Sequence, residues 1–231
     1  MKLSIIIPCY NEKNTILKVL KKVENAQIGE ITKEIIIIDD YSKDGTRELL
    51  KDPSFDFKAK VVFHDKNMGK GACIKTGLKH ISGDIVIIQD SDLEYDPDEY
   101  PLLLKPILDD KADVVYGSRF AGYQPHRVWY FWHYVVNKII TLLSNMLTNL
   151  KLTDMETCYK VFKASVASNM SLKENGFGFE PEFTLKIAKM HCRIYEVGIS
   201  YYGRHYREGK KINWKDGLWT LWCLLRYTVY D

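Results

Sequence analysis

The stretch of residues 84–97 reads DIVIIQDSDLEYDP, an apolar run that ends in a cluster of carboxylates. The run is rich in β-branched residues and is typical of a buried strand. Because side chains alternate across a strand, Asp90 and Asp92 can project to the same side where this strand ends. Two carboxylates at such a point suit Mg²⁺ or Mn²⁺, and substrate phosphates usually complete the coordination of these metals. The stretch therefore predicts metal-assisted phosphate chemistry.

The strand pattern recurs along the first half of the chain. Further apolar runs that read as strands lie at residues 3–7, 34–38, 60–63 and 113–117. Between these runs lie stretches with helical spacing, such as residues 16–23, whose apolar side chains fall on one face. Strands and helices in alternation, with strands that are almost continuously apolar, indicate an α/β fold. We expect a mostly parallel central sheet flanked by helices.

The second half of the chain is more apolar and aromatic. Residues 128–150 and 214–230 are predicted to form amphipathic helices that are rich in Leu, Trp and Tyr. Residues 183–191 have helical spacing, and residues 153–162 and 195–202 read as strands. No internal repeat or flexible linker divides the chain, so we expect its 231 residues to form a single domain.

The bulk composition excludes several classes of protein. A net charge of +3 is too small to indicate binding to nucleic acid. The five cysteines have no metal-site spacing, so we expect free thiols in a reducing compartment. The first residues carry no secretory signal, and no stretch reaches about 18 uncharged apolar residues. We therefore expect a cytoplasmic protein without a membrane-spanning segment.

Polar clusters follow four successive predicted strands, at residues 8–12, 39–45, 64–71 and 90–96. Ligands of open α/β sheets bind beyond the carboxyl ends of the strands. A single Asp after a strand is more often a turn or helix-cap residue. Four clusters at successive strand ends favour a binding site instead.

Two further segments carry groups that can bind phosphate. The glycine-rich turn NMGKG at residues 67–71 can bring backbone N–H groups and Lys70 near a phosphate. It matches neither the P-loop spacing nor the dinucleotide-binding GxGxxG pattern. The basic segment RHYREGKK at residues 204–211 is either a solvated loop or a loop that closes over a diphosphate.

Seven segments together resemble the inverting family 2 glycosyltransferases of GT-A fold. Within that family, the resemblance is to the polyprenol- and dolichol-phosphate mannose or glucose synthases. The segments are IIIPCYNE (5–12), IDDYSKDGT (38–46), NMGKG (67–71), DSDLE (90–94), GSR (117–119), DMETCYK (154–160) and RHYREGK (204–210). The resemblance covers nearly the whole chain. It implies a nucleotide-sugar-binding half at residues 1–120, an acceptor-binding half at residues 121–212 and a C-terminal helix at residues 213–231.

The resemblance implies which residues bind the nucleotide-sugar donor. Pro8, Tyr10 and Glu12 would line the pocket for the base and ribose. Asp40 would contact the nucleoside, whereas Asp39 would support the loop. The groups facing the donor diphosphate would be Lys70, Arg204 and Lys210.

It also implies a metal site and an acceptor site. Asp90, Asp92 and Glu94 resemble the DxD metal cluster of the family, in which the third position is often Gln or Ser. Arg119 and Arg127 resemble residues that hold the acceptor phosphate. Asp92 and Arg119 are therefore expected to take part in catalysis.

The residue types suit the implied chemistry. Displacing a nucleoside diphosphate from an anomeric carbon requires neutralisation of charge on the leaving group, which a metal with Arg and Lys can supply. A phosphate acceptor is already a nucleophile near neutral pH. A hydroxyl acceptor would need a carboxylate base, and Asp154 is the candidate. The alternative role of Asp154 is a structural cap at the start of a strand.

We therefore expect a glycosyltransferase dependent on Mg²⁺ or Mn²⁺. It would move a hexose from a donor of GDP-mannose or UDP-glucose type to a polyprenyl or dolichyl phosphate. The alternatives are a saccharide or protein hydroxyl acceptor, a nucleotidyltransferase, and a non-catalytic nucleotide-sugar-binding protein.

A lipid acceptor requires docking at a membrane. The two predicted amphipathic helices have the composition of interfacial helices. We therefore expect a peripheral protein at the cytoplasmic membrane face, with a homodimer or a membrane-anchor partner as further expectations. The alternative is that these helices pack on the sheet or across a dimer interface.

Overall fold

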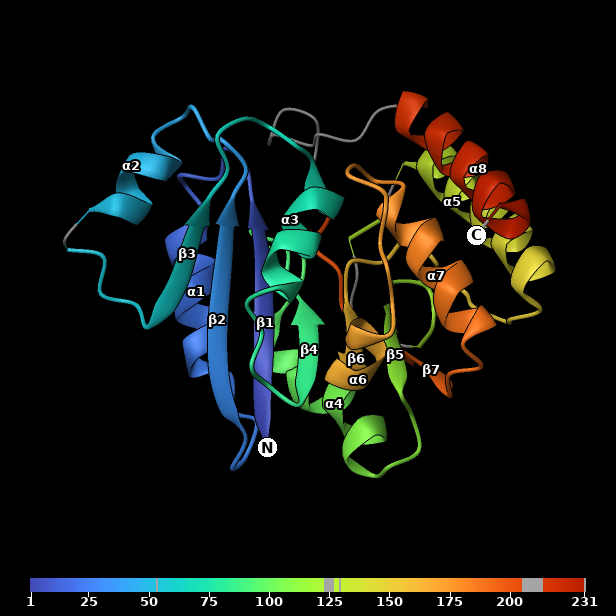
Figure 1. Cartoon of the computed structure of the whole chain (residues 1–231), viewed down its shortest axis with the longest axis horizontal. Coiled ribbons are helices and arrows are strands. Elements are labelled where there is room, and N and C mark those ends of the chain that lie inside the picture. Colours follow the sequence, from blue (N-terminus) through green and yellow to red (C-terminus); the bar gives the residue numbers. More distant parts are fainter. Residues whose placement is uncertain (53, 123–126, 129, 205–213, 231) are drawn as a thin grey trace.

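The strand order of the central sheet is β3-β2-β1-β4-β6-β5-β7 (Figure 1). The computed structural model describes residues 1–231 except 53, 123–126, 129, 205–213 and 231. The strands are β1 (Lys2–Cys9), β2 (Thr32–Asp39), β3 (Ala59–Phe63), β4 (Ile85–Ile88), β5 (Val114–Ser118), β6 (Lys160–Lys163) and β7 (Ile194–Gly198). Strand β6 runs antiparallel to β4 and β5, and the other neighbours are parallel.

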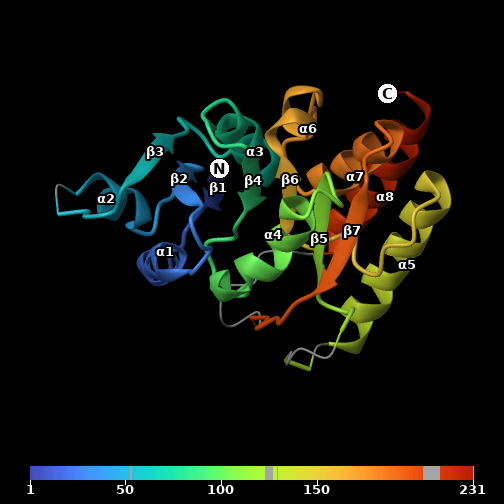
Figure 2. The ribbon, with the colours of Figure 1, turned by 90° about the horizontal axis from the view of Figure 1, so that it is seen from below.

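Helices cover both faces of the sheet. They are α1 (Ile16–Asn25), α2 (Thr46–Lys51), α3 (Lys70–Leu78), α4 (Tyr100–Leu108), α5 (Phe131–Thr148), α6 (Ala164–Ser168), α7 (Phe179–Lys189) and α8 (Trp214–Val229), with a short 3-10 helix, η1 (Pro97–Glu99). Helix α3 lies on one face, and α1 and α4 lie on the other (Figure 2). Helices α5, α7 and α8 pack against one another at the β5–β7 side of the sheet.

The predicted α/β fold with a mostly parallel sheet is confirmed. The amphipathic helix predicted at residues 128–150 is α5, and the one predicted at residues 214–230 is α8. One strand prediction was largely wrong. Of residues 153–162, only those from Lys160 onward pair as a strand, because the N–H groups of Thr153 and Asp154 donate to the Glu196 carboxylate instead.

The core explains why the strands are so strongly apolar. The isoleucine and valine side chains of β1, β2 and β4 are buried because helices cover both sides of the sheet. The runs 5–7, 36–38 and 85–88 are completely inaccessible to solvent. Burial on both faces leaves polar residues only at the strand ends.

The sheet topology brings the predicted site residues together beyond the carboxyl ends of the parallel strands, and we call this side the site edge of the sheet. Strands β1, β2, β3 and β4 are mutually parallel, so the segments that follow them emerge on the same side. Because β6 is antiparallel, its first residue lies at this edge as well, and Lys160 pairs with Tyr116 near the end of β5. The segment at residues 154–159 therefore approaches the ends of β4 and β5.

The close approach at Gly198 yields a test of this arrangement. A Cβ at Gly198 would lie 1.7 Å from the backbone oxygen of Ala121, so Gly198→Ala must displace the backbone that follows Arg119. We expect it to lower the free energy of unfolding by about 3 kcal/mol or more, measured by urea denaturation. The control is Gly217→Ala in α8, where the nearest atom lies 3.8 Å away. The control should be neutral or stabilising, since Ala favours helices. Equal stability of the two variants would contradict this packing.

Candidate active site

Three carboxylates lie directly after β4, and each is paired with a basic side chain. Asp90 Oδ1 lies 3.0 Å from Lys70 Nζ at the start of α3. Asp92 Oδ2 accepts a hydrogen bond of 2.9 Å from Arg204 Nη2. Glu94 accepts a hydrogen bond of 2.8 Å from the Arg204 backbone N–H and another from the Tyr201 hydroxyl. The structure thus brings the predicted metal residues together with two of the three predicted diphosphate-binding cations.

These carboxylates have the properties of a divalent-cation site. Burial, together with the negative charges of Asp90 and Glu94, raises the pKa of Asp92 to about 8 despite the neighbouring guanidinium. Asp90 and Glu94 thus disfavour ionisation of Asp92, and a cation held among these oxygens would relieve the repulsion. Closely spaced carboxylate oxygens of this kind fit Mg²⁺ or Mn²⁺.

A buried ionic chain extends behind the carboxylates. Lys70 Nζ lies 3.6 Å from Glu180 Oε1 in the first turn of α7, and Glu180 also accepts a hydrogen bond from Lys160. Lys160 is inaccessible to solvent and donates to the backbone oxygens of Met155 and Thr157 as well. Lys160 and Glu180 were not predicted as site residues. Because charged residues near strand and helix ends are common, the sequence gives no signal that would pair them.

The predicted base and ribose residues lie at the end of β1. Pro8 and Tyr10 are partly buried, and the Pro8 oxygen accepts a hydrogen bond from the Ser91 hydroxyl. The Glu12 carboxylate accepts hydrogen bonds of 3.0 and 3.1 Å from the Arg204 guanidinium. Glu12 thus shares its cation with Asp92. The proposed base and ribose contacts of this segment stay predictions.

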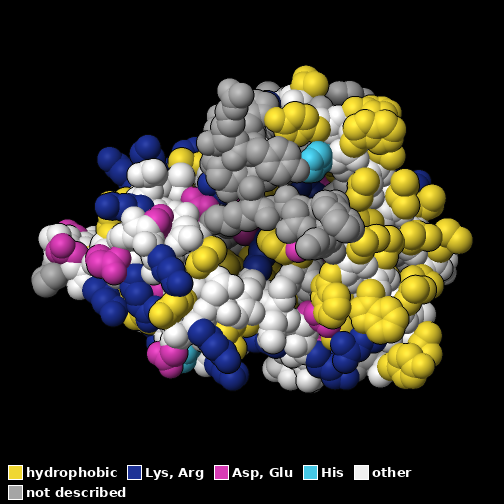
Figure 3. Space-filling view, turned by 90° about the horizontal axis from the view of Figure 1, so that it is seen from above, with side chains coloured by type: hydrophobic (Ala, Val, Ile, Leu, Met, Phe, Trp, Pro, Cys, Tyr) yellow, Lys and Arg dark blue, Asp and Glu magenta, His cyan; other side chains and the backbone are white. Residues whose placement is uncertain are grey.

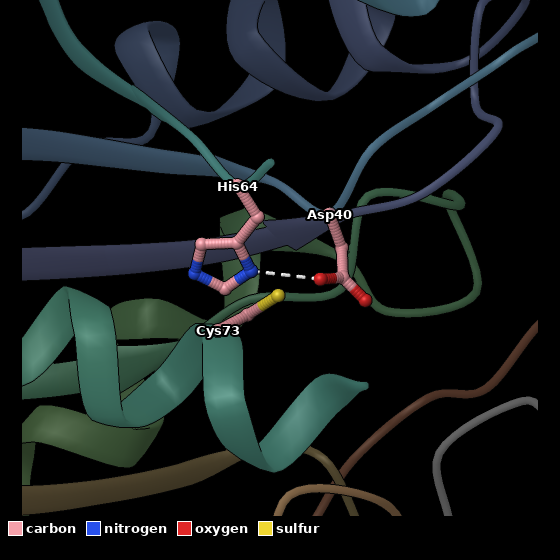
Figure 4. Close-up of side chains that lie close together, drawn as sticks. All are labelled: Asp40, His64 and Cys73. Atoms are coloured by element: carbon pink, nitrogen blue, oxygen red, sulfur yellow. Dashed lines mark hydrogen bonds and ion pairs between the residues drawn. The ribbon is translucent and has the colours of Figure 1, made fainter. Parts of the chain in front are cut away.

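Asp40 shapes the glycine-rich turn. Its carboxylate accepts hydrogen bonds of 2.9 and 2.7 Å from the N–H groups of Met68 and Gly69. It also lies 2.7 Å from Nδ1 of His64, and Cys73 completes a cluster whose ligand atoms all lie within 4.8 Å of one another (Figure 4). Burial and the nearby Asp40 raise the pKa of the Cys73 thiol above its usual range. The hydrogen bonds of Asp40 therefore hold the turn that carries Lys70. The predicted contact between Asp40 and the nucleoside stays a prediction.

Asp39, which the resemblance assigns to loop support, is completely buried. Its Oδ2 lies 3.7 Å from Nε of Arg47 and accepts a long hydrogen bond of 3.4 Å from the Ser42 N–H. Among the described residues, Asp39 Oδ1 has no hydrogen-bond partner. These contacts tie the end of β2 to the loop before α2.

Arg119 and Asp154 form a buried bidentate pair. Arg119 donates to the two Asp154 oxygens over 2.6 and 2.7 Å, and its backbone N–H donates over 3.0 Å. Burial alone would raise the pKa of Asp154, but the guanidinium holds it below its usual range. Such a carboxylate orients Arg119 at the end of β5. The role of a general base stays a prediction for Asp154.

Glu156 is a further carboxyl group that was not predicted as a site residue. Its Oε1 is buried and, within the described part of the chain, lacks a hydrogen-bond partner. Burial and the negative charge of Glu180 raise the pKa of Glu156 to about 8, although Lys160 and Arg119 oppose the shift. Glu156 is therefore the carboxyl group of this segment best suited to gain or release a proton near neutral pH.

Two predicted residues remain, Arg127 and Lys210. Nη1 of Arg127 donates to the Gly203 oxygen over 2.9 Å, which ties this residue to the segment that carries Arg204. Lys210 lies outside the described residues.

The pKa of Glu156 predicts a pH-dependent stability. In the unfolded chain Glu156 ionises near pH 4.5, whereas in the folded chain it keeps its proton up to about pH 8. Between these values the folded state binds more protons, so this residue lowers stability as the pH rises. Glu156→Gln cannot ionise and should be more stable than the parent by about 2–4 kcal/mol at pH 8, with little difference near pH 4.5.

Calorimetric unfolding at a series of pH values measures this difference. The control is Glu30→Gln at an exposed position, for which the difference from the parent should be small throughout. A difference for Glu156→Gln that does not change with pH would contradict the prediction.

Comparisons with known proteins agree with this architecture. Residues 4–170 match the glycosyl transferase family 2 model. The chain is 28% identical over 218 residues to the dolichol-phosphate mannosyltransferase of Pyrococcus furiosus, covering 92% of this chain and 61% of that protein. It is 27% identical over 213 residues to the undecaprenyl-phosphate 4-deoxy-4-formamido-L-arabinose transferase of Salmonella paratyphi B, covering 90% and 62%. The chain thus spans less than two thirds of the length of these relatives.

A solved structure confirms the fold. Glucosyl-3-phosphoglycerate synthase from Mycobacterium tuberculosis, in complex with Mn²⁺, uridine diphosphate and glucosyl-3-phosphoglycerate, superposes with a TM-score of 0.76 at 20% identity. The match covers 98% of this chain and 80% of that one. At this identity the likeness concerns the fold alone, whereas the family model matches well over half of the sequence. The chain therefore belongs to glycosyl transferase family 2.

Proposed function

We propose that this chain is an inverting glycosyltransferase that moves a hexose from a nucleoside-diphosphate sugar, of GDP-mannose or UDP-glucose type, to a polyprenyl phosphate. The observation that carries the proposal is the meeting of Asp90, Asp92 and Glu94 with Lys70 and Arg204 at one edge of the sheet. Carboxylates beside a diphosphate-binding cation are the groups needed to hold a metal and a leaving nucleoside diphosphate.

The acidic residues would bind the metal ion, and the basic residues would bind the phosphates. Asp90, Asp92 and Glu94 would hold Mg²⁺ or Mn²⁺, which when bound supplies positive charge to the leaving diphosphate. Lys70, on the first turn of α3, stands where its ammonium group can face a phosphate beside the helix N-terminus. Arg204 adds a second cation with a planar set of donors that suits phosphate oxygens.

A lipid phosphate is the acceptor that the relatives favour. The printed names of two relatives refer to dolichol phosphate and undecaprenyl phosphate. In this chain Arg119 stands at the end of β5, oriented by Asp154, where it can bind the acceptor phosphate. A phosphate oxygen needs no strong base, which agrees with the engagement of Asp154 by Arg119.

A hydroxyl group of a saccharide or protein is the second candidate acceptor. The observation that favours it is Glu156, whose buried Oε1 has no hydrogen-bond partner among the described residues. Once it is ionised, such a carboxyl group can accept a proton from a hydroxyl group. The two acceptors therefore predict different consequences for Glu156→Gln, since loss of a base abolishes transfer to a hydroxyl but not to a phosphate.

An exposed apolar surface supports docking at a membrane. We call it the α5–α8 surface, and it comprises Phe131, Trp132, Val136, Ile139, Leu142 and Met146 of α5 with Leu218, Trp219, Trp222, Leu225 and Val229 of α8. Figure 3 shows apolar side chains gathered over this side of the molecule. Trp132 is 72% exposed and Trp222 is 53% exposed, which is unusual for such large apolar side chains. In the part of the chain that the structure describes, no helix is long and apolar enough to cross a bilayer.

Product analysis tests the reaction. The full chain is incubated with Mn²⁺, a panel of nucleotide sugars, and short polyprenyl phosphates or saccharides, and products are identified by mass. We expect a glycosyl phosphate lipid together with a nucleoside diphosphate. Asp92→Ala should reduce the rate at least about a thousandfold, because it removes charge stabilisation of the leaving group. The control is Asp109→Ala at the end of α4, which should leave the rate unchanged. Retained activity of Asp92→Ala would refute the metal-site assignment.

Co-sedimentation with liposomes tests the membrane assignment. We expect the chain to bind vesicles that contain anionic lipid, and the double variant Trp132→Ser and Trp222→Ser to partition at least about tenfold less, because it removes two large apolar anchors. The control is Leu108→Ser, an exposed apolar residue on α4. Equal binding of the double variant and the parent would show that the α5–α8 surface is not the docking face.

A further inference from the structure

Arg204 lies at the centre of the carboxylate cluster. Its Nη1 and Nη2 donate to the two oxygens of Glu12 over 3.1 and 3.0 Å, and Nη2 also donates to Asp92 over 2.9 Å. Its Nε lies 3.5 Å from Glu94. One guanidinium therefore joins three carboxylates that come from the ends of two different strands.

Arg204 lies close to several carboxylates, but not all of its N–H groups form hydrogen bonds. Within the described residues Nε has no hydrogen-bond partner, although it is buried. Among the described contacts, Arg204 is the cation that Glu12, Asp92 and Glu94 share, whereas Lys70 is engaged with Asp90. Buried carboxylates need a counter-charge. Arg204 supplies it, but with one positive charge where a divalent ion would bring two.

Most of the guanidinium's donors are engaged with carboxylates. Nη1 donates to Glu12, and Nη2 donates to Glu12 and Asp92, so a diphosphate that is bound through these two nitrogens would have to replace the carboxylates. While Arg204 holds Asp92, it also competes with a metal ion for that carboxylate. A metal ion that takes Asp92 as a ligand would therefore displace the guanidinium from that carboxylate, and the freed donors could then face a diphosphate.

We propose that Arg204 is the counter-cation of the Glu12 and Asp92 carboxylates, and that it exchanges them for the diphosphate when metal and nucleotide bind together. The proposal rests on the proposed function, since it takes Asp92 as a metal ligand. It adds that the chain disfavours metal alone, because an ion must then displace Arg204 without offering it a new partner. A nucleoside diphosphate provides that partner, so each ligand strengthens the binding of the other.

Binding of Mn²⁺ without turnover tests the exchange. Free Mn²⁺ is measured by electron paramagnetic resonance during titration of the full chain, with and without UDP or GDP. Arg204→Met should bind Mn²⁺ alone roughly tenfold or more tightly than the parent, because the competing cation is gone. The nucleoside diphosphate should increase Mn²⁺ affinity less in Arg204→Met than in the parent. Arg204→Lys keeps the positive charge but loses the planar set of donors, so its Mn²⁺ affinity should lie between those of the parent and Arg204→Met. It replaces Arg204→Met in the test if that variant does not fold.

The matched control is Arg193→Met. Arg193 also joins two carboxylates, Asp110 and Asp113, at 2.9 Å, but it does so at the opposite edge of the sheet. Its removal should leave Mn²⁺ binding unchanged. If the Arg204 variants bind Mn²⁺ no more tightly than the parent, the exchange is refuted while the metal site stands. If no form binds Mn²⁺, even with a nucleoside diphosphate, the metal site of the proposed function fails and the exchange with it.

Discussion

The structure depends on the neutralisation of buried carboxylates at one edge of the sheet. Four ion pairs provide it: Lys70–Asp90, Lys160–Glu180, Arg119–Asp154 and Arg204–Asp92. A buried carboxylate that loses its partner destabilises a fold by about 3–5 kcal/mol, and this applies to Asp154 and Glu180, which are buried. The partners lie 20 to 112 residues apart in sequence. Each pair therefore depends on the relative placement of the elements that carry its two members.

The parallel arrangement of the first half could be predicted from the sequence. The apolar runs of β1, β2 and β4 are buried on both faces of the sheet. A continuous apolar pattern predicts such burial. Once the strands are parallel, their polar ends must share an edge. The grouping of Glu12, Asp40 and Asp92 at this edge therefore followed from pattern and topology, and the resemblance added the expected roles.

The partners of these residues could not be predicted in the same way. The direction of β6 is not encoded in its four residues, and only its antiparallel pairing places Lys160 beside the end of β5. In the sequence, nothing distinguishes Asp154 from other Asp residues near predicted strand ends. Its pairing with Arg119 depends on where β5 ends. Glu156 carries no motif signal of its own beyond the segment. Its raised pKa comes from burial beside Glu180, a residue of α7 that is distant in sequence.

Charge balance also limits which ligands the edge can accept. A metal ion alone must compete with Arg204 for Asp92, and a diphosphate alone must approach carboxylates that would repel it. In the proposed exchange, an ion would take the place of the guanidinium beside Asp92, and the guanidinium would face the phosphates. Each ligand would then relieve the repulsion that the other meets when it binds alone. An acidic cluster that is held by its own cations would thus favour ligands that bring charges of both signs.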